Sequence, residues 1–328
     1  MDKKIQIAIC GYGNLGKGVE SEIEKNPDME LAAIFTRRKD TDSLETKSNV
    51  PVVHTGDASE WKDKVDVMIL CGGSKSDLPL QGPLLAKDFN TVDSFDTHAK
   101  IPDYFKEIDE AAKAGNNISI ISIGWDPGLF SLMRLYFGSV LQDGKTYSFW
   151  GEGVSQGHSE AIRGIEGVTG AIQYTVPSPS AMDRVRKGEN PELTAREKHK
   201  RLCYVVLEPG ADAQIIKKKI QEMPDYFADY DTTVYFISEE ELINKHAKMK
   251  HGGNVIHIGQ TGDGHNQSIE FSLKLDSNPE FTSSILISFA RAAYRLSAAG
   301  KCGARTIFDI KPKLLGLSDP DDLMSNLL

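Results

Sequence analysis

The sequence has 328 residues, of which 40% are hydrophobic and 26% charged, and its formal net charge at pH 7 is -9. This length suffices for about two domains with a substantial core, and the negative charge argues against a nucleic-acid-binding protein that relies on broad electrostatic attraction. No apolar stretch approaches the roughly 18 residues that span a membrane, so we expect small-molecule partners, no nucleic acid and no membrane.

The first 125 residues alternate short β-rich runs with helical patterns, which is typical of βαβ units and a parallel sheet. We predict strands at 5–10, 31–35, 65–71, 90–95 and 118–124. Helices are predicted between them, at 14–25, 77–89 and 102–115, where Gly115 stands at the position of a C-cap. This half of the chain is therefore expected to form a doubly wound sheet.

After "GWDPGLF" the pattern changes to strands with fewer helices between them: 146–153, 171–176, 201–208, 232–238, 254–259 and 268–275. We predict a mixed or antiparallel sheet here, and we interpret the charged segment 184–201 as a solvated linker. The apolar helical pattern of 279–300 is expected to pack back on the first sheet. The predicted fold is α/β: a Rossmann-type, doubly wound parallel sheet of residues 1–125, with about 279–328 packed on it, plus an α+β domain of residues 126–278 with a mixed sheet.

The segment Gly11-Tyr12-Gly13-Asn14-Leu15-Gly16 fits G-x-G-x-x-G, directly after a predicted strand and at the start of a predicted helix. In that context Gly11 forms the tight turn, Gly13 lets the backbone approach a pyrophosphate, and Gly16 brings the helix against the strand. The anion then binds the unpaired amides of the helix start. A dinucleotide is therefore the predicted ligand.

The second predicted strand, 31–35, is followed by Thr36-Arg37-Arg38, where an NAD-binding protein would carry a carboxylate for the ribose hydroxyls. A hydroxyl and two guanidinium groups suit a phosphate monoester instead. We predict NADP(H) as the cofactor; the alternative is that the two arginines are solvated surface residues. The loop Cys71-Gly72-Gly73-Ser74 follows the next strand, at the edge where the nicotinamide and substrate should lie.

Two aspartates, Asp96 and Asp126, follow predicted strands at this same edge. Two carboxylates near a hydride acceptor would suit a substrate with an ammonium group, which they could pair with and orient. This favours amine oxidation over alcohol oxidation. Alternatively, each aspartate forms a turn or caps a helix, since Asp before Pro-Gly is a common turn sequence.

Other chemistries lack sequence support. The histidines show no metal-ligand spacing, and no metal is predicted. A G-x-S-x-G nucleophile motif is absent. The cysteines, Cys10, Cys71, Cys203 and Cys302, form no C-x-x-C pair, and the first 13 residues have too short an apolar run for a signal peptide. We therefore expect a cytoplasmic protein.

Taken together, the motifs resemble those of the meso-diaminopimelate dehydrogenase family, nearly from end to end. They are "GYGNLG", "PDMELAAIFTRR", "VDSFDTH", "GWDPGLFS", "FWGEGVSQGHS", "QYTVPS", "HKRLCYVV", "MPDYF", "HGGNVI" and "LKLDSNP". The resemblance implies an NADP-dependent enzyme of lysine and diaminopimelate biosynthesis. It oxidises the D-centre of meso-2,6-diaminopimelate to L-2-amino-6-oxopimelate with release of ammonia and NADPH, and it forms a homodimer.

The resemblance also implies roles for individual residues. Cofactor contacts would come from Gly11, Tyr12, Gly13, Asn14, Leu15, Gly16, Thr36, Arg37, Arg38, Cys71, Gly72, Gly73, Ser74, Ser94, Phe95, Asp96, Ile123, Gly124, Trp125, Asp126 and Pro127. Asp96 and Asp126 would engage the D-centre as catalytic residues, framed by Trp150, Gln156 and Gly157. Thr175, Arg201, His251 and Asn278 would bind the L-centre. Ile123 departs from the threonine expected before Gly-Trp-Asp, with a small effect because the backbone makes most contacts there.

Three alternatives remain open on the sequence alone. One is another NADP-dependent oxidoreductase of amino-acid or aspartate-pathway metabolism with the same two-domain plan. The second is a D-amino-acid dehydrogenase of broader specificity, because side-chain packing sets the breadth of the pocket. The third is a non-catalytic protein that senses NADPH, against which the two aspartates and the polar residues of the second half argue.

Overall fold

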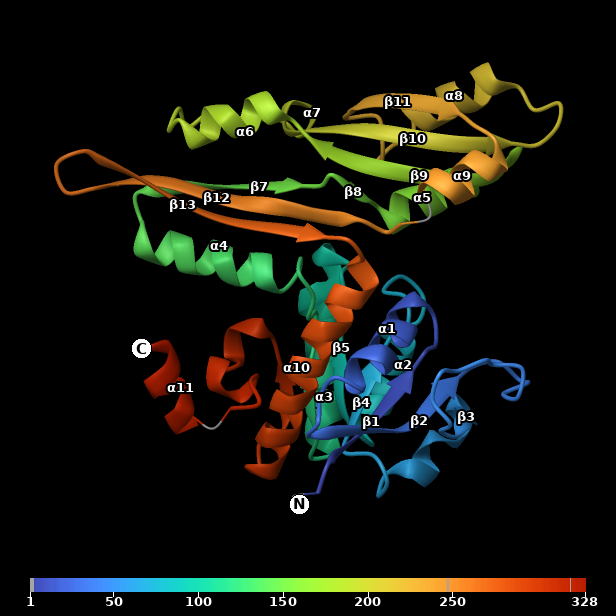
Figure 1. Cartoon of the computed structure of the whole chain (residues 1–328), viewed down its shortest axis with the longest axis vertical. Helices are drawn as coiled ribbons and strands as arrows, with labels where there is room; N and C mark the ends of the chain where they lie inside the picture. Colours follow the sequence, from blue (N-terminus) through green and yellow to red (C-terminus); the bar gives the residue numbers. More distant parts are fainter. Residues whose placement is uncertain (1–2, 247, 319) are drawn as a thin grey trace. The chain divides into compact units, whose positions relative to one another are not determined.

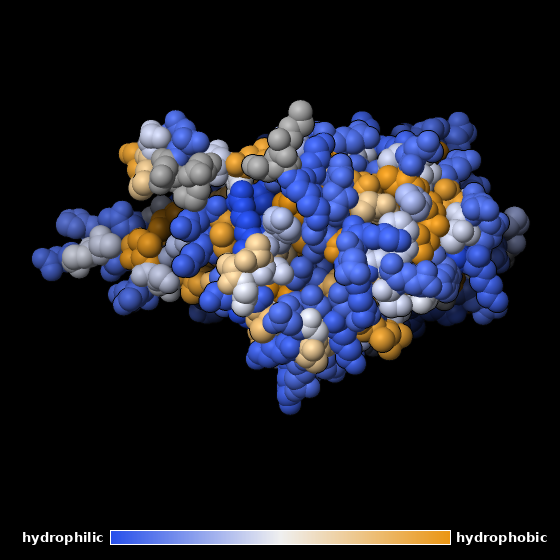
Figure 2. All heavy atoms as spheres, turned by 90° about the horizontal axis from the view of Figure 1, so that it is seen from below, coloured by the Kyte–Doolittle hydropathy of each residue, from blue (hydrophilic) through white to orange (hydrophobic). Residues whose placement is uncertain are grey.

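The computed structural model describes residues 3–246, 248–318 and 320–328. The chain divides into two compact units, the first made of residues 1–132 and 279–328 and the second of residues 133–278. Within the described residues, no helix is long and apolar enough to cross a membrane. Hydrophilic side chains cover most of the face in Figure 2, with smaller hydrophobic areas between them.

The first unit is built on a parallel sheet of seven strands in the order β14-β6-β5-β4-β1-β2-β3. Strands β1 to β5 of this sheet are labelled in Figure 1. The strands are β1 (Ile5–Cys10), β2 (Met29–Thr36), β3 (Val52–His54), β4 (Val67–Leu70), β5 (Asn90–Asp93), β6 (Ile118–Ile120) and β14 (Gly303–Arg305). Its helices are α1 (Asn14–Ile23), α2 (Leu78–Ala86), α3 (Ile101–Ala114), α10 (Asn278–Ala298) and α11 (Pro320–Leu327), with short 3-10 turns at Thr55–Trp61, His98–Lys100, Ile307–Asp309 and Pro312–Leu314. The helix α4 (Leu129–Val140) begins in this unit.

Helices cover both faces of this sheet, so its central strands are buried almost along their whole length. One face packs against α2 and α3, in a core that includes Phe35, Met68 and Leu70. On the other face, Ile9 lies against Gly16 of α1, and Gly18 of α1 lies against Ser283 of α10. The predicted doubly wound parallel sheet is thus confirmed.

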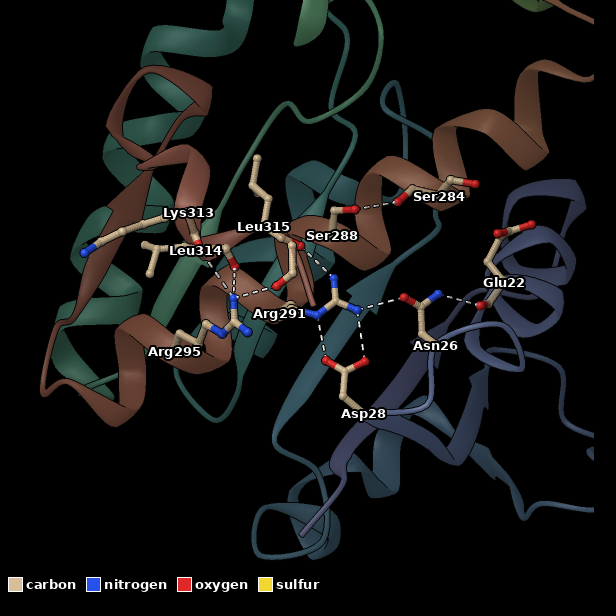
Figure 3. A network of polar contacts seen from close by, with 11 residues as sticks. Glu22, Asn26, Asp28, Ser284, Ser288, Arg291, Arg295, Lys313, Leu314 and Leu315 are labelled. Carbon is tan, nitrogen blue, oxygen red and sulfur yellow. Dashed lines mark hydrogen bonds and ion pairs between the residues drawn. The ribbon is translucent and has the colours of Figure 1, made fainter. Parts of the chain in front are cut away.

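The C-terminal segment is held to the first unit through Arg291 of α10 (Figure 3). Its guanidinium, 2% exposed, forms a two-pronged ion pair with Asp28, with an Nε–Oδ2 distance of 2.6 Å and an Nη2–Oδ1 distance of 3.0 Å. It also donates to the Asn26 side chain and to the Leu315 carbonyl, both at 2.7 Å. Planar, bidentate pairing of this kind is geometrically specific. It joins α10 to residues 26–28 within the compact unit that residues 279–328 share with residues 1–132.

The second unit contains two sheets. A four-stranded mixed sheet has the order β11-β10-β9-β8, and a three-stranded antiparallel sheet has the order β13-β12-β7. The strands are β7 (Gly144–Trp150), β8 (Gly153–Val154), β9 (Val168–Pro177), β10 (His199–Leu207), β11 (Asp231–Phe236), β12 (His251–Thr261) and β13 (His265–Leu275). The helices are α5 (Gln156–Arg163), α6 (Pro179–Arg186), α7 (Ala195–Lys198), α8 (Ala213–Gln221) and α9 (Glu239–His246). The predicted mixed sheet is present, together with the antiparallel sheet of the long β12–β13 hairpin (Figure 1).

Several elements differ from the sequence prediction. The short edge strands β3 and β14 were not predicted, because three residues are too few to show a period. The strand predicted at 118–124 ends at Ile120, because the chain turns at Ser122, where φ is +58°. The interpretation of 184–201 as a solvated linker is wrong at both ends. Val185 is fully buried on α6, in the core that packs on the three-stranded sheet. His199 is 2% exposed and begins β10.

Candidate active site

The glycine turn after β1 has the tight geometry that its spacing predicts. Gly11 has a φ of +97°, a region that favours glycine. A Cβ on Gly16 would lie 2.2 Å from the Gly11 carbonyl oxygen, so α1 can approach the turn only with glycine at this position. In front of Gly13, by contrast, a Cβ would meet no heavy atom within 4 Å. The turn thus offers open space to a ligand where α1 begins at Asn14 and Leu15.

A pocket of about 310 Å³ opens beside this turn. It brings the glycine turn together with the end of β2 and the loop after β4: Gly11, Tyr12, Gly13, Thr36, Arg37, Arg38, Leu44, Thr55, Cys71, Gly72, Asp77 and Gln81 line it. The Thr36 hydroxyl accepts a hydrogen bond from the Arg38 backbone N–H at 3.2 Å. Arg37 Nη2 lies 2.9 Å from Asp77 Oδ1. Two guanidinium groups and a hydroxyl therefore line the same pocket as the glycine turn, a combination that fits the 2′-phosphate of NADP.

Four lining residues were not predicted from the sequence: Leu44, Thr55, Asp77 and Gln81. Thr55 follows the short strand β3, and Leu44 lies in the irregular segment before it. Asp77 is the N-cap residue of α2, and its carboxylate accepts from the Gly73 N–H at 3.0 Å. Its position at the start of the helix predicted at 77–89 was a signal in the sequence, but that signal points to a cap as readily as to a binding site.

Further along the same edge of the sheet, the buried carboxylate of Asp93 ties two loops together. It accepts from the backbone N–H groups of Phe95 at 2.9 Å and Ser122 at 3.0 Å, and from the Tyr104 hydroxyl at 2.8 Å. Burial raises the pKa of Asp93, and these hydrogen bonds oppose the rise. The loops that carry Asp96 and Asp126 therefore have a common anchor, which sequence reasoning missed.

Each of these loops has a defined internal structure. The backbone N–H of Asp96 donates to Ser74 Oγ at 3.1 Å, which joins the 94–96 loop to the 71–74 loop. In the loop that carries Asp126, the backbone N–H of Leu129 donates to the Gly124 carbonyl. A Cβ on Gly128 would lie 1.8 Å from the same carbonyl oxygen. Asp126 lies within this closed turn and is partly exposed.

Most of the other predicted cofactor residues also lie at this edge. Ile123, Gly124 and Trp125 are buried, Gly73 is exposed, and Ser94 and Pro127 are partly exposed. Phe95 is buried and stacks on Tyr104, with ring centroids 4.2 Å apart. The Ile123 N–H donates to the Asp93 carbonyl at 2.8 Å. The backbone N–H of Ile123 is therefore engaged within the protein, and the small effect of isoleucine in place of threonine stays a prediction.

In the second unit, Arg201 and Thr175 lie opposite each other on neighbouring strands β10 and β9. Arg201 is 7% exposed, donates through Nη1 to the Thr175 hydroxyl, and lies with Cζ 3.9 Å from the centre of the Tyr230 ring. Its Nε has no hydrogen-bond partner among the described residues. Burial lowers the pKa of Arg201, while Tyr230 opposes the decrease. A buried guanidinium with an unpaired donor is suited to a carboxylate ligand.

The other predicted residues of this unit border the same end of the two sheets. Thr175 pairs with Gly153 of β8, and a Cβ on Gly153 would lie 2.4 Å from the His251 ring. Burial lowers the pKa of His251. The backbone N–H of Asn278 donates to the carbonyl of Met249 at 2.9 Å. This arrangement brings His251 close to Thr175 and Arg201.

The three residues predicted to frame the D-centre occupy two places. Trp150 ends β7, and its backbone N–H donates to His199 Nε2 at 2.9 Å. Gln156 and Gly157 begin α5 and are exposed. The Gln156 amide lies 3.1 Å from the sulfur of Met249. Among the described residues, no group of three or more His, Cys, Asp or Glu side chains could hold a metal ion.

Comparison with known proteins agrees with this geometry. Residues 124–277 match the family described as diaminopimelic acid dehydrogenase C-terminal domain. The chain is 60% identical to the meso-diaminopimelate D-dehydrogenase of Ureibacillus thermosphaericus over 325 residues, 99% of each chain.

Two solved structures are also similar. One is the Corynebacterium glutamicum DAP dehydrogenase in complex with DAP, at 44% identity and a TM-score of 0.93, with coverage of 99% of this chain and 100% of the other. The second, an engineered D-amino acid dehydrogenase bound to NADP⁺, has 43% identity, a TM-score of 0.89 and the same coverage. The resemblance inferred from the sequence motifs is thereby confirmed, and the chain belongs to the meso-diaminopimelate D-dehydrogenase family.

Proposed function

We propose that the chain catalyses the reversible, NADP-dependent oxidative deamination of meso-2,6-diaminopimelate at its D-centre, in lysine and diaminopimelate biosynthesis. The products are L-2-amino-6-oxopimelate, ammonia and NADPH. One observation carries the choice of substrate: the buried Arg201, beside Thr175, keeps an unpaired Nε donor among the described residues. A second carboxylate on an amino-acid substrate would satisfy this donor, and the related dehydrogenase from C. glutamicum was solved in complex with DAP.

We assign the dinucleotide to the first unit. Arg37, Arg38 and Thr36 would bind the 2′-phosphate, and the turn at Gly13 would bind the pyrophosphate. The remaining predicted cofactor residues would contact the nicotinamide half. NADP, when bound, supplies the acceptor for the hydride. The NADP⁺ bound to the related engineered D-amino acid dehydrogenase supports this assignment.

We assign recognition of the L-centre to the second unit. Arg201 would bind the carboxylate with two N–H groups, and Thr175, His251 and Asn278 would add hydrogen bonds. A zwitterionic group needs partners for both charges, because an unpaired buried charge costs several kcal/mol (order of magnitude). Anchoring this end leaves the hydrogen of the D-centre in a defined direction, which would produce the stereospecificity.

At the D-centre, Asp96 and Asp126 would pair with the ammonium group and hold the carbon in position, framed by Trp150, Gln156 and Gly157. The amine must lose a proton before its carbon loses hydride, and one of the two carboxylates, directly or through water, would accept that proton. The resulting imine adds water, and its C–N bond breaks to release ammonia and leave the oxo group.

A homodimer and a cytoplasmic location belong to the same proposal. The edge strand β11 carries Tyr235, 45% exposed, and Phe236, 37% exposed. Aromatic residues of this kind are enriched in subunit interfaces. All four cysteines are free thiols, which suits a reducing compartment. Light scattering after size-exclusion chromatography would test the dimer.

The decisive experiment follows the formation of NADPH at 340 nm with NADP and single stereoisomers of diaminopimelate. We expect activity with the meso isomer and none with the LL isomer or with homoserine. Activity with many D-amino acids would favour the broader dehydrogenase, and binding of NADPH without turnover of any of them would favour a sensor. An Arg201→Met variant should raise KM for the meso isomer by about a hundredfold, as expected for the loss of charge-assisted hydrogen bonds.

The role of the carboxylates can be tested separately. An Asp126→Asn variant should reduce kcat by about a hundredfold or more, the range of general acid–base catalysis. Its affinity for NADPH, measured by quenching of tryptophan fluorescence, should stay near that of the wild type. A variant with normal turnover would remove Asp126 from the proposed role.

A further inference from the structure

One buried carboxylate of the first unit takes no part in the proposed chemistry. Glu20 lies on α1, is 1% exposed, and is absent from the lining of the pocket. It accepts hydrogen bonds from four donors: the Tyr12 hydroxyl, the Ser48 hydroxyl, the Ser48 N–H at 2.8 Å and the Lys47 N–H at 3.1 Å. A carboxylate is seldom buried so completely unless donors satisfy it. These bonds therefore define the place of the segments that supply them.

The donors belong to two different segments of the chain, each of which contributes a residue to the pocket lining. Tyr12 stands in the glycine turn and lines the pocket directly. Lys47 and Ser48 lie in residues 41–51, the second part of the connection between β2 and β3, which also carries Leu44, another lining residue. Glu20 thus connects the glycine turn to this segment without lining the pocket itself.

The segment of residues 41–51 has little structure of its own that would fix it. Leu44 donates its N–H to the Thr41 carbonyl at 3.2 Å, and the Thr46 hydroxyl donates to the Ser48 carbonyl at 2.9 Å. Lys47 Nζ also donates to Ser21 Oγ, on α1, at 2.7 Å. The attachment to α1 therefore comes from residues 47 and 48, and Glu20 receives three of the bonds.

We infer that Glu20 is a positioning residue for the adenosine 2′-phosphate end of the cofactor. It holds Tyr12 and the segment that carries Leu44 in the places where they border the bound nucleotide, on the same pocket that contains Arg37 and Arg38. This inference rests on the proposed binding of NADP in that pocket. It goes beyond that proposal because it assigns cofactor affinity to a residue that does not touch the cofactor.

The titration of the groups agrees with this role. Burial would raise the pKa of Glu20, but the hydrogen bonds from Ser48, Tyr12 and Lys47 outweigh it and lower the pKa. Burial and the bond to Glu20 raise the pKa of Tyr12 to about 12, so this hydroxyl stays a donor. The network is a charge-assisted one, which an amide in place of the carboxylate would weaken.

The test compares Glu20→Gln and Ser48→Ala with the wild type. Glu20→Gln removes the negative charge and replaces one acceptor oxygen with an NH₂ donor. Ser48→Ala removes only the hydrogen bond from the Ser48 hydroxyl to Glu20 and leaves the pocket lining intact. A Glu24→Gln variant is the matched control, because Glu24 is an exposed carboxylate at the end of the same helix. Isothermal titration measures the Kd of NADPH and of adenosine 2′,5′-bisphosphate, at a temperature well below the thermal midpoint of each variant.

If the ordered segment is populated about one time in five in Glu20→Gln, both dissociation constants rise about fivefold, and by the same factor. Ser48→Ala should show a smaller increase of the same kind, and Glu24→Gln none. At saturating NADPH, kcat and the KM for the amino acid should match the wild type. A merely structural role would lower the thermal midpoint without this equal loss of affinity for the two ligands.

The inference is overturned if folded Glu20→Gln binds both ligands as the wild type does, or if NADPH alone binds more weakly. Should Glu20→Gln fail to fold, Ser48→Ala decides by the same criterion. Failure of the proposed function has a different signature, because the wild type itself would then fail to bind NADPH and the bisphosphate.

Discussion

Replacement of His199 by glutamine should flatten the dependence of the unfolding free energy on pH in the acid range. His199 is 2% exposed, and its Nε2 accepts the backbone N–H of Trp150 at 2.9 Å. The imidazole also stacks on the indole of Trp150, with ring centroids 5.3 Å apart. Burial, and then the charges of Arg201 and Lys198, lower the pKa of His199 from 6.5 to about 3. The folded enzyme therefore holds this side chain neutral at every pH above that value.

The sign of the effect follows from proton linkage. Below pH 6.5 the unfolded chain binds a proton at His199 that the folded chain does not, so the free energy of unfolding decreases as the pH falls. The decrease continues until about pH 3, where the folded state also takes up the proton. Between pH 7 and pH 5 this single group should cost the folded enzyme about 2 kcal/mol. Glutamine keeps an acceptor for the Trp150 N–H but does not titrate.

The assay is urea unfolding at pH 5, 6 and 7, followed by tryptophan fluorescence and circular dichroism, which must give coincident transitions. The wild type should lose about 2 kcal/mol more than His199→Gln between pH 7 and pH 5. A His98→Gln variant, which changes an exposed histidine, is the control and should keep the wild-type dependence. Equal losses for His199→Gln and the wild type would refute the reasoning.

Three further predictions concern other parts of the molecule. Arg291→Met should lower the free energy of unfolding by about 3 kcal/mol in urea titrations, because Asp28 loses its buried partner; an unchanged midpoint would contradict the anchoring role of this pair. Gln173→Met should raise the thermal midpoint and add about 1 kcal/mol, because both side-chain polar atoms of Gln173 lack a hydrogen-bond partner among the described residues; a clear loss of stability would show that the amide is satisfied. Combined Arg37→Ala and Arg38→Ala should weaken NADP about a hundredfold in isothermal titration and leave NAD nearly unchanged, whereas equal weakening of both would rule out contact with the 2′-phosphate.

Local pattern in the sequence was sufficient for part of the pocket beside the glycine turn, but not for Leu44 and Thr55, which lie before and after the unpredicted strand β3. Spacing and composition alone predict the glycine turn and the strand β2, which ends at Thr36. They also predict the helices α1 and α2. Such features depend on residues within one or two turns of each other, and the structure confirms them with shifts of a few residues at the ends. The short strands β3 and β14 lack enough residues for any period and were missed.

Long-range contacts could not be inferred in this way. Glu20 is hydrogen-bonded to Ser48, and Asp93 is hydrogen-bonded to Ser122. Arg291 pairs with Asp28, which lies 263 positions earlier in the sequence. A period in the sequence indicates that a side chain is buried, but it does not indicate which distant segment is buried against it. For Glu20 and Arg291 even burial was not predicted, because an isolated glutamate or arginine in a helix usually points to solvent.

For this protein the sequence by itself determined the class of fold, the type of cofactor and the set of residue types available for binding an amino acid, because each depends on short motifs whose geometry is local. Only the tertiary structure decided which carboxylates became internal anchors, at Glu20 and Asp93, and which histidine became a neutral acceptor, at His199. The physical reason is that burial and hydrogen bonding from other segments set the charge and the partners of a polar side chain, and both arise only when the chain is folded.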